Sequence, residues 1–182
     1  MKLIKNTGTN RVIDVLRQAT QSGVSLDIAS PVLSLFAFSE LRDLLSRSAH
    51  SRLMLPLDTD GDLAFLGSSS DRPARNRLQA RWLARECSKW IREKTDVRQS
   101  LGPLPQSAYV IQHSDSTQSR VITGNCPLTT DGLGLAPGNQ FGLIQCAEAP
   151  VEVALLAAWY ESLWNAMPAS TKAKTPVPGS AR

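Results

Sequence analysis

Residues 120–133 form the segment of this sequence that is best suited to carry chemistry. Residues 121–122 are β-branched and predict a buried strand, and Gly124 gives the backbone the freedom to turn sharply after it. Either Thr129 or Thr130 is suited to cap a short helix start beyond the turn. A strand followed by a glycine turn can direct several backbone N–H groups at one anion. Taken alone, the segment predicts a phosphate-binding turn.

A second chemical feature is a row of cations on the longest predicted helix, which begins near Pro73 and runs to about Lys94. Arginine suits bidentate phosphate contacts, and a tryptophan on the edge of the row could stack on a base or on a protein partner. One interpretation is therefore a face that binds a DNA backbone or an acidic subunit. The other is a solvated outer face, partly balanced by Glu86 and Glu93. The residues of the candidate binding face are Arg77, Arg81, Trp82, Arg85, Lys89 and Arg92.

Composition limits the class of protein that can position these groups. The chain has 182 residues, which is enough for one domain with a substantial core, and its net charge of +4 permits an acidic partner without requiring one. The three cysteines, Cys87, Cys126 and Cys146, are far apart and have no metal-ligand spacing, so we expect buried free thiols, no metal site and no cofactor.

Hydrophobic patterning predicts alternating helices and strands, and hence a mixed central sheet flanked by helices in one α/β sandwich. We expect the domain to span residues 1–168 and the Ser-, Thr-, Lys- and Pro-rich residues 169–182 to form a disordered tail. No apolar run reaches membrane-spanning length, so a soluble cytoplasmic protein without a membrane partner is expected. The predicted helices are 10–22, 39–49, 73–94 and 151–164, and the predicted strands are 24–29, 52–56, 96–101, 107–111, 121–123 and 140–146.

In this order of elements the chain resembles the phospholipase D-like domains, most closely those attached to bacterial helicases and to defence or restriction systems. The resemblance covers about residues 10–165 and implies a phospholipase D-like fold. Its individual motifs are weak, and the order of the elements carries it. The matching segments are 10–13, 26–30, 36–41, 52–55, 108–111, 121–129, 132–133 and 159–164.

The resemblance implies a catalytic signature of histidine, lysine two residues on, a nearby aspartate, then Gly-Ser and an asparagine. In that family the histidine forms a covalent phospho-intermediate, lysine and asparagine hold the phosphate, and single-copy members pair two chains to build the site. In this chain the histidine falls near Pro105 or Gln106 and the lysine near Ser107. Gly124 keeps the glycine, Asn125 replaces the serine, and a proline at 127 replaces the asparagine.

The predicted function is therefore a catalytically inactive interaction module in a bacterial nucleic-acid processing or anti-phage defence complex. It would dock on a helicase or translocase subunit or form a homodimer, with DNA as a further candidate partner. Ser107, Gly124 and Asn125 would be the vestigial site. The alternative is an active phosphodiesterase or nuclease with a rearranged site built from His113, Asp115 and Asn125, in which His113 replaces the lost nucleophile. A third hypothesis is a regulatory or structural protein without a nucleic-acid partner.

Overall fold

A computed structural model describes residues 1–20, 23–56, 77–139 and 141–168 of the chain, with only the backbone described at 77–79. Its centre is a seven-stranded sheet with the strand order β1-β7-β6-β5-β2-β3-β4. Strands β2, β3 and β4 run parallel to one another, whereas β5, β6, β7 and β1 pair in antiparallel fashion. The strands are β1 (Lys2–Leu3), β2 (Ser25–Ala29), β3 (His50–Pro56), β4 (Thr95–Ser100), β5 (Ser107–Gln112), β6 (Arg120–Gly124) and β7 (Ile144–Ala147).

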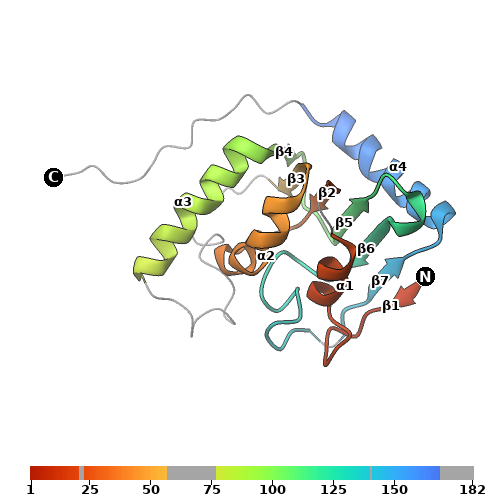
Figure 1. The fold of residues 1–182 in the computed structure, drawn as a ribbon, viewed down its shortest axis with the longest axis horizontal. Helices are drawn as coiled ribbons and strands as arrows, with labels where there is room; N and C mark the ends of the chain where they lie inside the picture. The colour runs from red at the N-terminus through yellow and green to blue at the C-terminus, as the bar shows by residue number, and fades with distance from the viewer. Residues whose placement is uncertain (21–22, 57–76, 140, 169–182) are drawn as a thin grey trace.

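Four described helices cover the two faces of this sheet (Figure 1). Helices α1 (Val12–Ala19), α2 (Leu35–Arg47) and α3 (Arg77–Lys94) share the larger core cluster with one face. Helix α4 (Pro150–Ala166) packs against the other face. The mixed sheet flanked by helices confirms the predicted α/β sandwich.

The two cores follow from the period-two alternation of the strands. In β5, Tyr109 and Ile111 enter the larger cluster, while Ala108 and Val110 contact the α4 side. All four side chains are fully buried, because helices cover both faces of the sheet at this central strand.

A buried charge pair attaches α4 to the sheet. Asp27 of β2 is 2 % exposed and receives two hydrogen bonds from Arg52 of β3, at 2.8 and 2.7 Å. Arg52 also donates to Glu161 of α4 at 2.7 Å, and its guanidinium lies 5.3 Å from the ring of Tyr160 and 5.2 Å from that of Trp164. The hydrogen bonds to Asp27, and after them the hydrogen bond to Glu161, raise the pKa of Arg52 further above its usual value.

Helix α2 begins earlier than the sequence predicted. Its N-cap is Ser34, whose hydroxyl accepts hydrogen bonds from the N–H groups of Phe36 and Ala37, so residues 35–38 are helical rather than a lead-in to a helix at Ser39. Helix α1 has no side-chain cap from Thr9 or Asn10. Instead the Asn6 side chain accepts from the N–H of Val12 at 3.1 Å.

The remaining differences concern the sheet edge and the turn after β6. Strand β7 has four residues instead of the predicted seven. The two-residue strand β1 pairs with it and was not predicted, because two residues are too few to show an alternating apolar pattern. Residues 125–136 contain no helix, because Thr129 accepts from the N–H of Gly132 and closes a turn there. The expected tail at 169–182 and the beginning of the predicted helix at residues 73–76 lie outside the described residues.

Candidate functional site

The residues predicted to form a vestigial site lie at one end of the β5–β6 hairpin, where Ser107 and Gly124 are paired in register. Ser107 is fully buried, and its hydroxyl forms no hydrogen bond with any residue that the structure describes. The hydroxyl is therefore enclosed by protein and is not accessible to a phosphate group from solvent. The structure thus brings Ser107 and Gly124 together but leaves this pair without an exposed polar group.

Gly124 has a structural reason to be glycine. Its φ of +131° lies in a region that side chains rarely adopt, and an added Cβ would stand 2.0 Å from the carbonyl oxygen of Leu143. The next residue, Asn125, donates its backbone N–H to that same oxygen at 2.9 Å. The close approach of β6 to the chain before β7 therefore accounts for this glycine without any anion.

The Asn125 side chain faces Gly142, where an added Cβ would stand 2.5 Å from its Nδ2 atom. Asn125 is itself exposed, so its amide is accessible from solvent. Pro127, the second replaced position, has no side-chain donor for a phosphate. Asn125 is therefore the one member of the predicted vestigial set that offers an accessible donor.

An apolar groove lies where the resemblance places the catalytic histidine. Pro105 and Gln106 contribute to the wall of a cavity of about 320 Å³ beside the ends of β2, β3 and β4. The other lining residues are almost all apolar, and α4 supplies one side of the groove through Trp159 and Leu163. The described residues that line the groove include no histidine, lysine or arginine, so they offer a phosphoryl group neither a charged donor nor an imidazole nucleophile.

The alternative site does not assemble. His113 and Asp115 follow β5 at the turn of the hairpin, whereas Asn125 follows β6 at the opposite end. In this register Asn125 and His113 are seven residue positions apart along the hairpin, or about 23 Å at 3.3 Å per residue. Asp115 accepts hydrogen bonds from Thr117 and caps a 3₁₀ turn, and these bonds lower the pKa of its carboxyl. His113 and Asp115 thus have separate local partners, and no hydrogen bond joins their side chains in the described part of the chain.

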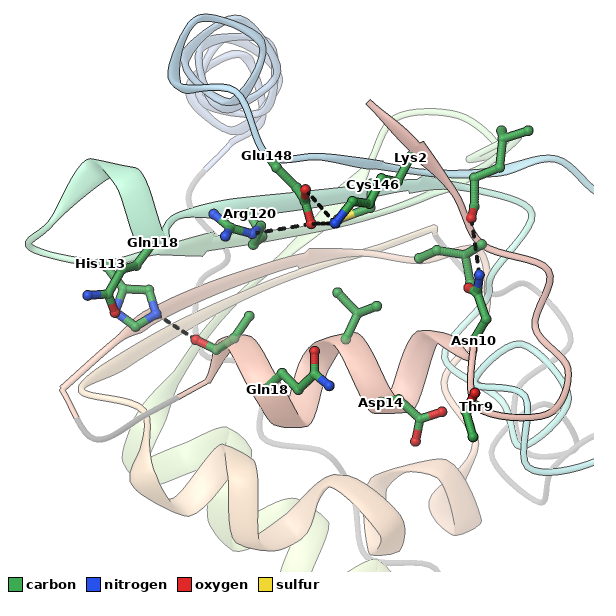
Figure 2. A pocket seen from close by; sticks show the side chains of 14 residues that line it. Lys2, Thr9, Asn10, Asp14, Gln18, His113, Gln118, Arg120, Cys146 and Glu148 are labelled. Carbon is green, nitrogen blue, oxygen red and sulfur yellow. Dashed lines mark hydrogen bonds and ion pairs between the residues drawn. The ribbon is translucent and has the colours of Figure 1, made fainter.

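His113 lines a second, more polar pocket of about 520 Å³ between α1 and the β1–β7–β6 edge of the sheet. Its Nε2 atom lies 2.5 Å from the carbonyl oxygen of Ala19. Figure 2 shows the His113 ring at one end of this pocket. Lys2 and Arg120 line the same pocket, and both approach Glu148, at 2.9 and 3.7 Å. The sequence gives no local signal for these two cations beside His113, because the pairing of β1 and β6 with β7 brings them together.

The cationic row of α3 is exposed where its side chains are described. Arg81, Arg85, Lys89 and Arg92 face solvent, and none of them forms a salt bridge with another residue in the described ranges. The side chain of Arg77 lies outside the described residues. The opposite face of α3 is buried through Leu83, Cys87 and Trp90, as the pattern predicted.

Trp82, at the edge of this row, is 47 % exposed, and the guanidinium of Arg42 from α2 lies 5.2 Å from its ring centre. Arg42 adds a fifth described cation to the surface, and the sequence did not identify it because α2 and α3 meet only in the folded protein. An aromatic ring beside several exposed cations, four of which form no salt bridge with a described residue, is an arrangement that can contact a base and its phosphates.

The three cysteines are buried and free, as predicted. Burial raises the pKa of the Cys87 and Cys126 thiols to about 12, so both remain protonated near neutral pH. No helix among the described residues is both long enough and apolar enough to cross a bilayer.

The mixed sheet, its helical layers and the position of the β5–β6 hairpin define an α/β protein with the fold of the phospholipase D family. Among solved structures, the chain is similar to Nuc, a phospholipase D family member from Salmonella typhimurium, with a TM-score of 0.51 and 12 % identity over 85 % of this chain and 86 % of that one. It is similar to NucT from Helicobacter pylori, with a TM-score of 0.52 and 10 % identity over 87 % of each chain.

A third similar structure is TrmBL2, an archaeal chromatin protein described as showing a novel mode of DNA binding. Its TM-score is 0.50 at 13 % identity, over 93 % of this chain and 52 % of that one. No protein-family model and no curated protein matches the sequence. The likeness is therefore one of fold.

Proposed function

We propose that this chain is a catalytically inactive phospholipase D-like module that contacts DNA through the outer face of α3. The observation that carries the proposal is the apolar groove at Pro105 and Gln106, where a phosphodiesterase of this fold would need its nucleophile. The proposal includes a role in a bacterial nucleic-acid processing or anti-phage defence complex, with docking on a helicase or translocase subunit or pairing of two copies. The resemblance of residues 10–165 to helicase- and defence-associated domains supports that setting.

The DNA-binding part of the proposal is supported by charge and shape together. From residue 77 to residue 92 the row covers about 22 Å at 1.5 Å per residue, a length over which one strand of a duplex presents several phosphates. The exposed arginines offer bidentate donors, and Trp82 offers a ring for stacking. The DNA-binding neighbour of the same fold is consistent with this use.

The test is DNA binding, measured by fluorescence anisotropy over a range of salt concentrations, for the wild type and for Arg81→Glu/Arg85→Glu. We expect the double variant to bind roughly tenfold or more weakly near 0.1 M salt, and the slope of log K against log salt to fall by about 1.8, which is 0.9 for each lost phosphate contact. The matched control is Lys2→Glu/Lys5→Glu at the opposite edge of the sheet. Both variants change the net charge from +4 to 0. A difference in DNA affinity between them therefore reports where the charge was changed and not the net charge.

Equal binding by the wild type and the α3 variant, or an equal loss in both variants, would refute a specific α3 interface. Catalysis is tested separately with bis-nitrophenyl phosphate and single-stranded DNA in the absence of added metal. An inactive module shows no turnover above the buffer rate.

The alternative, a hydrolytic site at His113, is favoured by one observation, namely the pocket that also contains Lys2 and Arg120. A hydrolase at this pocket requires His113 to leave the Ala19 carbonyl and the two cations to release Glu148. Turnover that His113→Ala abolishes would establish this alternative in place of the inactive module.

A further inference from the structure

The exposed tryptophan beside the cationic row lies at a seam between two helices. Trp82 of α3 and Arg42 of α2 meet there, with the guanidinium 5.2 Å from the centre of the ring. Phe38 of α2 and Trp90 of α3 hold the same two helices together from the core side, with ring centres 5.6 Å apart. Although Arg42 covers one face of its ring, Trp82 remains 47 % exposed. A flat ligand can therefore reach the accessible part of the ring from solvent.

Arg42 prepares the ring for such a ligand. A guanidinium stacked on an indole restricts the orientations of both groups, so less rotational freedom remains to be lost when a ligand binds. The ion pair of Arg42 with Asp43 is long, at 4.0 Å, and the Asp43 side chain is 83 % exposed, so this pair does not draw the guanidinium away from the ring. A ligand on the open part of the ring would complete a stack of three planar groups.

Three cations follow Trp82 along the outer side of α3. Arg85, Lys89 and Arg92 are exposed and are spaced by three or four residues, so they lie on one side of the helix within about 15 Å of Trp82 at 1.5 Å per residue. A ring followed at once by several cations matches a ligand in which a flat base is attached to a chain of phosphates.

The acids of this surface do not cancel its positive charge. Asp43 on α2 and Glu86 and Glu93 on α3 are the acids next to the seam and the row. The cations beside them are more numerous, namely Arg42, Arg81, Arg85, Lys89 and Arg92. The surface therefore attracts a polyanion while leaving the ring free of a carboxylate partner of its own.

A paired base cannot use this ring. In a duplex both faces of each base are covered by its neighbours, and breaking that stack costs about as much as one contact with an aromatic side chain returns. The base edges are out of reach as well, because two packed helices are about 20 Å wide and the major groove is about 12 Å wide. A duplex can therefore contact only the cations, whereas an unpaired base can use the ring and the cations together.

We propose that the seam between α2 and α3 is a stacking site for an unpaired nucleobase, in which one base of a single-stranded DNA lies on Trp82 and the neighbouring phosphates lie on Arg85 and Lys89. The proposal rests on the contact of α3 with DNA named in the proposed function and narrows the ligand from DNA in general to a single strand.

Fluorescence anisotropy tests the proposal with a labelled oligonucleotide of about 20 nucleotides and with the duplex that it forms with its complement, at about 0.2 M salt. We expect the wild type to bind the single strand about fivefold or more tightly than the duplex, because only the single strand gains the stacking contact. Trp82→Ala should lose roughly 5- to 150-fold of its single-strand affinity, the usual loss for one stacked base, and should change duplex affinity by less than about twofold.

Two further variants separate loss of the ring from loss of folding. Phe141→Ala is the matched control, since it removes another exposed aromatic ring, one that is 98 % exposed and lies before β7 near the opposite edge of the sheet. This control should bind both ligands like the wild type. Trp82→Phe keeps a smaller ring and should lose less single-strand affinity than Trp82→Ala. Circular dichroism confirms that each variant is folded.

Salt dependence identifies the kind of contact that is lost. Stacking releases no counterions, so Trp82→Ala should lower the single-strand affinity without changing the slope of log K against log salt. Arg85→Gln/Lys89→Gln removes two phosphate contacts and should lower that slope by about 1.4, which is 0.7 for each contact with a single strand.

The outcomes distinguish this inference from the proposed function. Equal affinity for single strand and duplex, or an equal loss of both in Trp82→Ala, overturns the stacking site, and the DNA-binding function of α3 stands if Arg81→Glu/Arg85→Glu still weakens binding. A slope that falls in Trp82→Ala as it does in the Arg85 and Lys89 variant also overturns stacking, because the loss is then electrostatic. Absence of binding to either ligand overturns the proposed DNA-binding function and the stacking site with it.

Discussion

Removing Arg52 is expected to destabilise this protein more than removal of any single surface charge. Arg52 is the direct partner of Asp27, a carboxylate that is 2 % exposed and that accepts two hydrogen bonds from this one guanidinium. In Arg52→Ala the carboxylate loses its counter-charge and both donors, while the surrounding sheet still excludes water. Glu161, the second partner, is about half exposed and becomes hydrated when the pair is broken.

The size of the effect follows from the burial of Asp27. Breaking a buried ion pair by removing one partner typically costs about 3–5 kcal/mol, because the remaining charge is left uncompensated. The variant also loses the packing of the guanidinium on Tyr160 and Trp164, which holds α4 on the sheet. With a urea m-value of about 2–3 kcal/mol/M for a domain of this size, the midpoint of unfolding should fall by roughly 1–2.5 M.

Urea unfolding followed by tryptophan fluorescence measures this shift, and two further variants identify its cause. Arg52→Lys keeps the charge but loses the two-pronged geometry, so we expect an intermediate loss. Asp27→Ala/Arg52→Ala removes both charges and should be more stable than Arg52→Ala alone, since no buried carboxylate remains. A loss below about 1 kcal/mol in Arg52→Ala, or a double variant less stable than the single one, would refute this account of the pair.

Two further predictions concern the glycine turn and acid stability. Gly124→Ala should destabilise the fold by about 1–3 kcal/mol or more, because the alanine would have to adopt a positive φ against the Leu143 carbonyl. The control is Gly102→Ala, which should have little effect in the same urea assay because no atom lies within 4 Å of the added Cβ. Arg52 lowers the pKa of Glu161 through their hydrogen bond, so the stability from this pair is present above the ordinary glutamate pKa and is lost as pH falls through the lower folded-state pKa. Between about pH 5 and pH 3 the free energy of unfolding of the wild type, measured with urea, should therefore fall by more than that of Glu161→Gln. The difference should stay below about 1 kcal/mol, because Glu161 is about half exposed. Parallel pH profiles of the two proteins would contradict this account of the pair.

The secondary structure was predictable where one face of an element is buried. The apolar positions of α3 at Leu83, Cys87 and Trp90 and those of α4 at Val153, Tyr160 and Trp164 are buried as their helical spacing predicted. The β5–β6 hairpin was predictable because two β-branched strands flank a short polar turn. These elements carry their pattern locally, so neighbouring residues are enough to identify them.

Features decided by long-range pairing were not predictable. Strand β1 exists because β7 offers it a free edge, and α2 begins at Leu35 because Ser34, which is fully buried in the folded protein, caps it. The sequence also gave no sign that Arg42 would lie on Trp82, or that Lys2 and Arg120 would share a pocket with His113. Each of these contacts joins residues of different elements, and their distance depends on how the elements pack.

The sequence by itself determined the class of fold, the buried thiols and the existence of a cationic helix face, because periodicity and composition set these properties. It also led to the prediction that the catalytic residues implied by the resemblance are replaced, since that prediction depends on residue identity alone. Only the tertiary structure decided that Gly124 is needed for the close approach of Leu143 and that Asn125 and His113 lie at opposite ends of the hairpin. It also decided that Val151, Leu155 and Trp159 of α4 are exposed among the described residues. The physical reason is that strain, distance and exposure are properties of groups brought together in space, and they follow from strand pairing and helix docking across the whole domain.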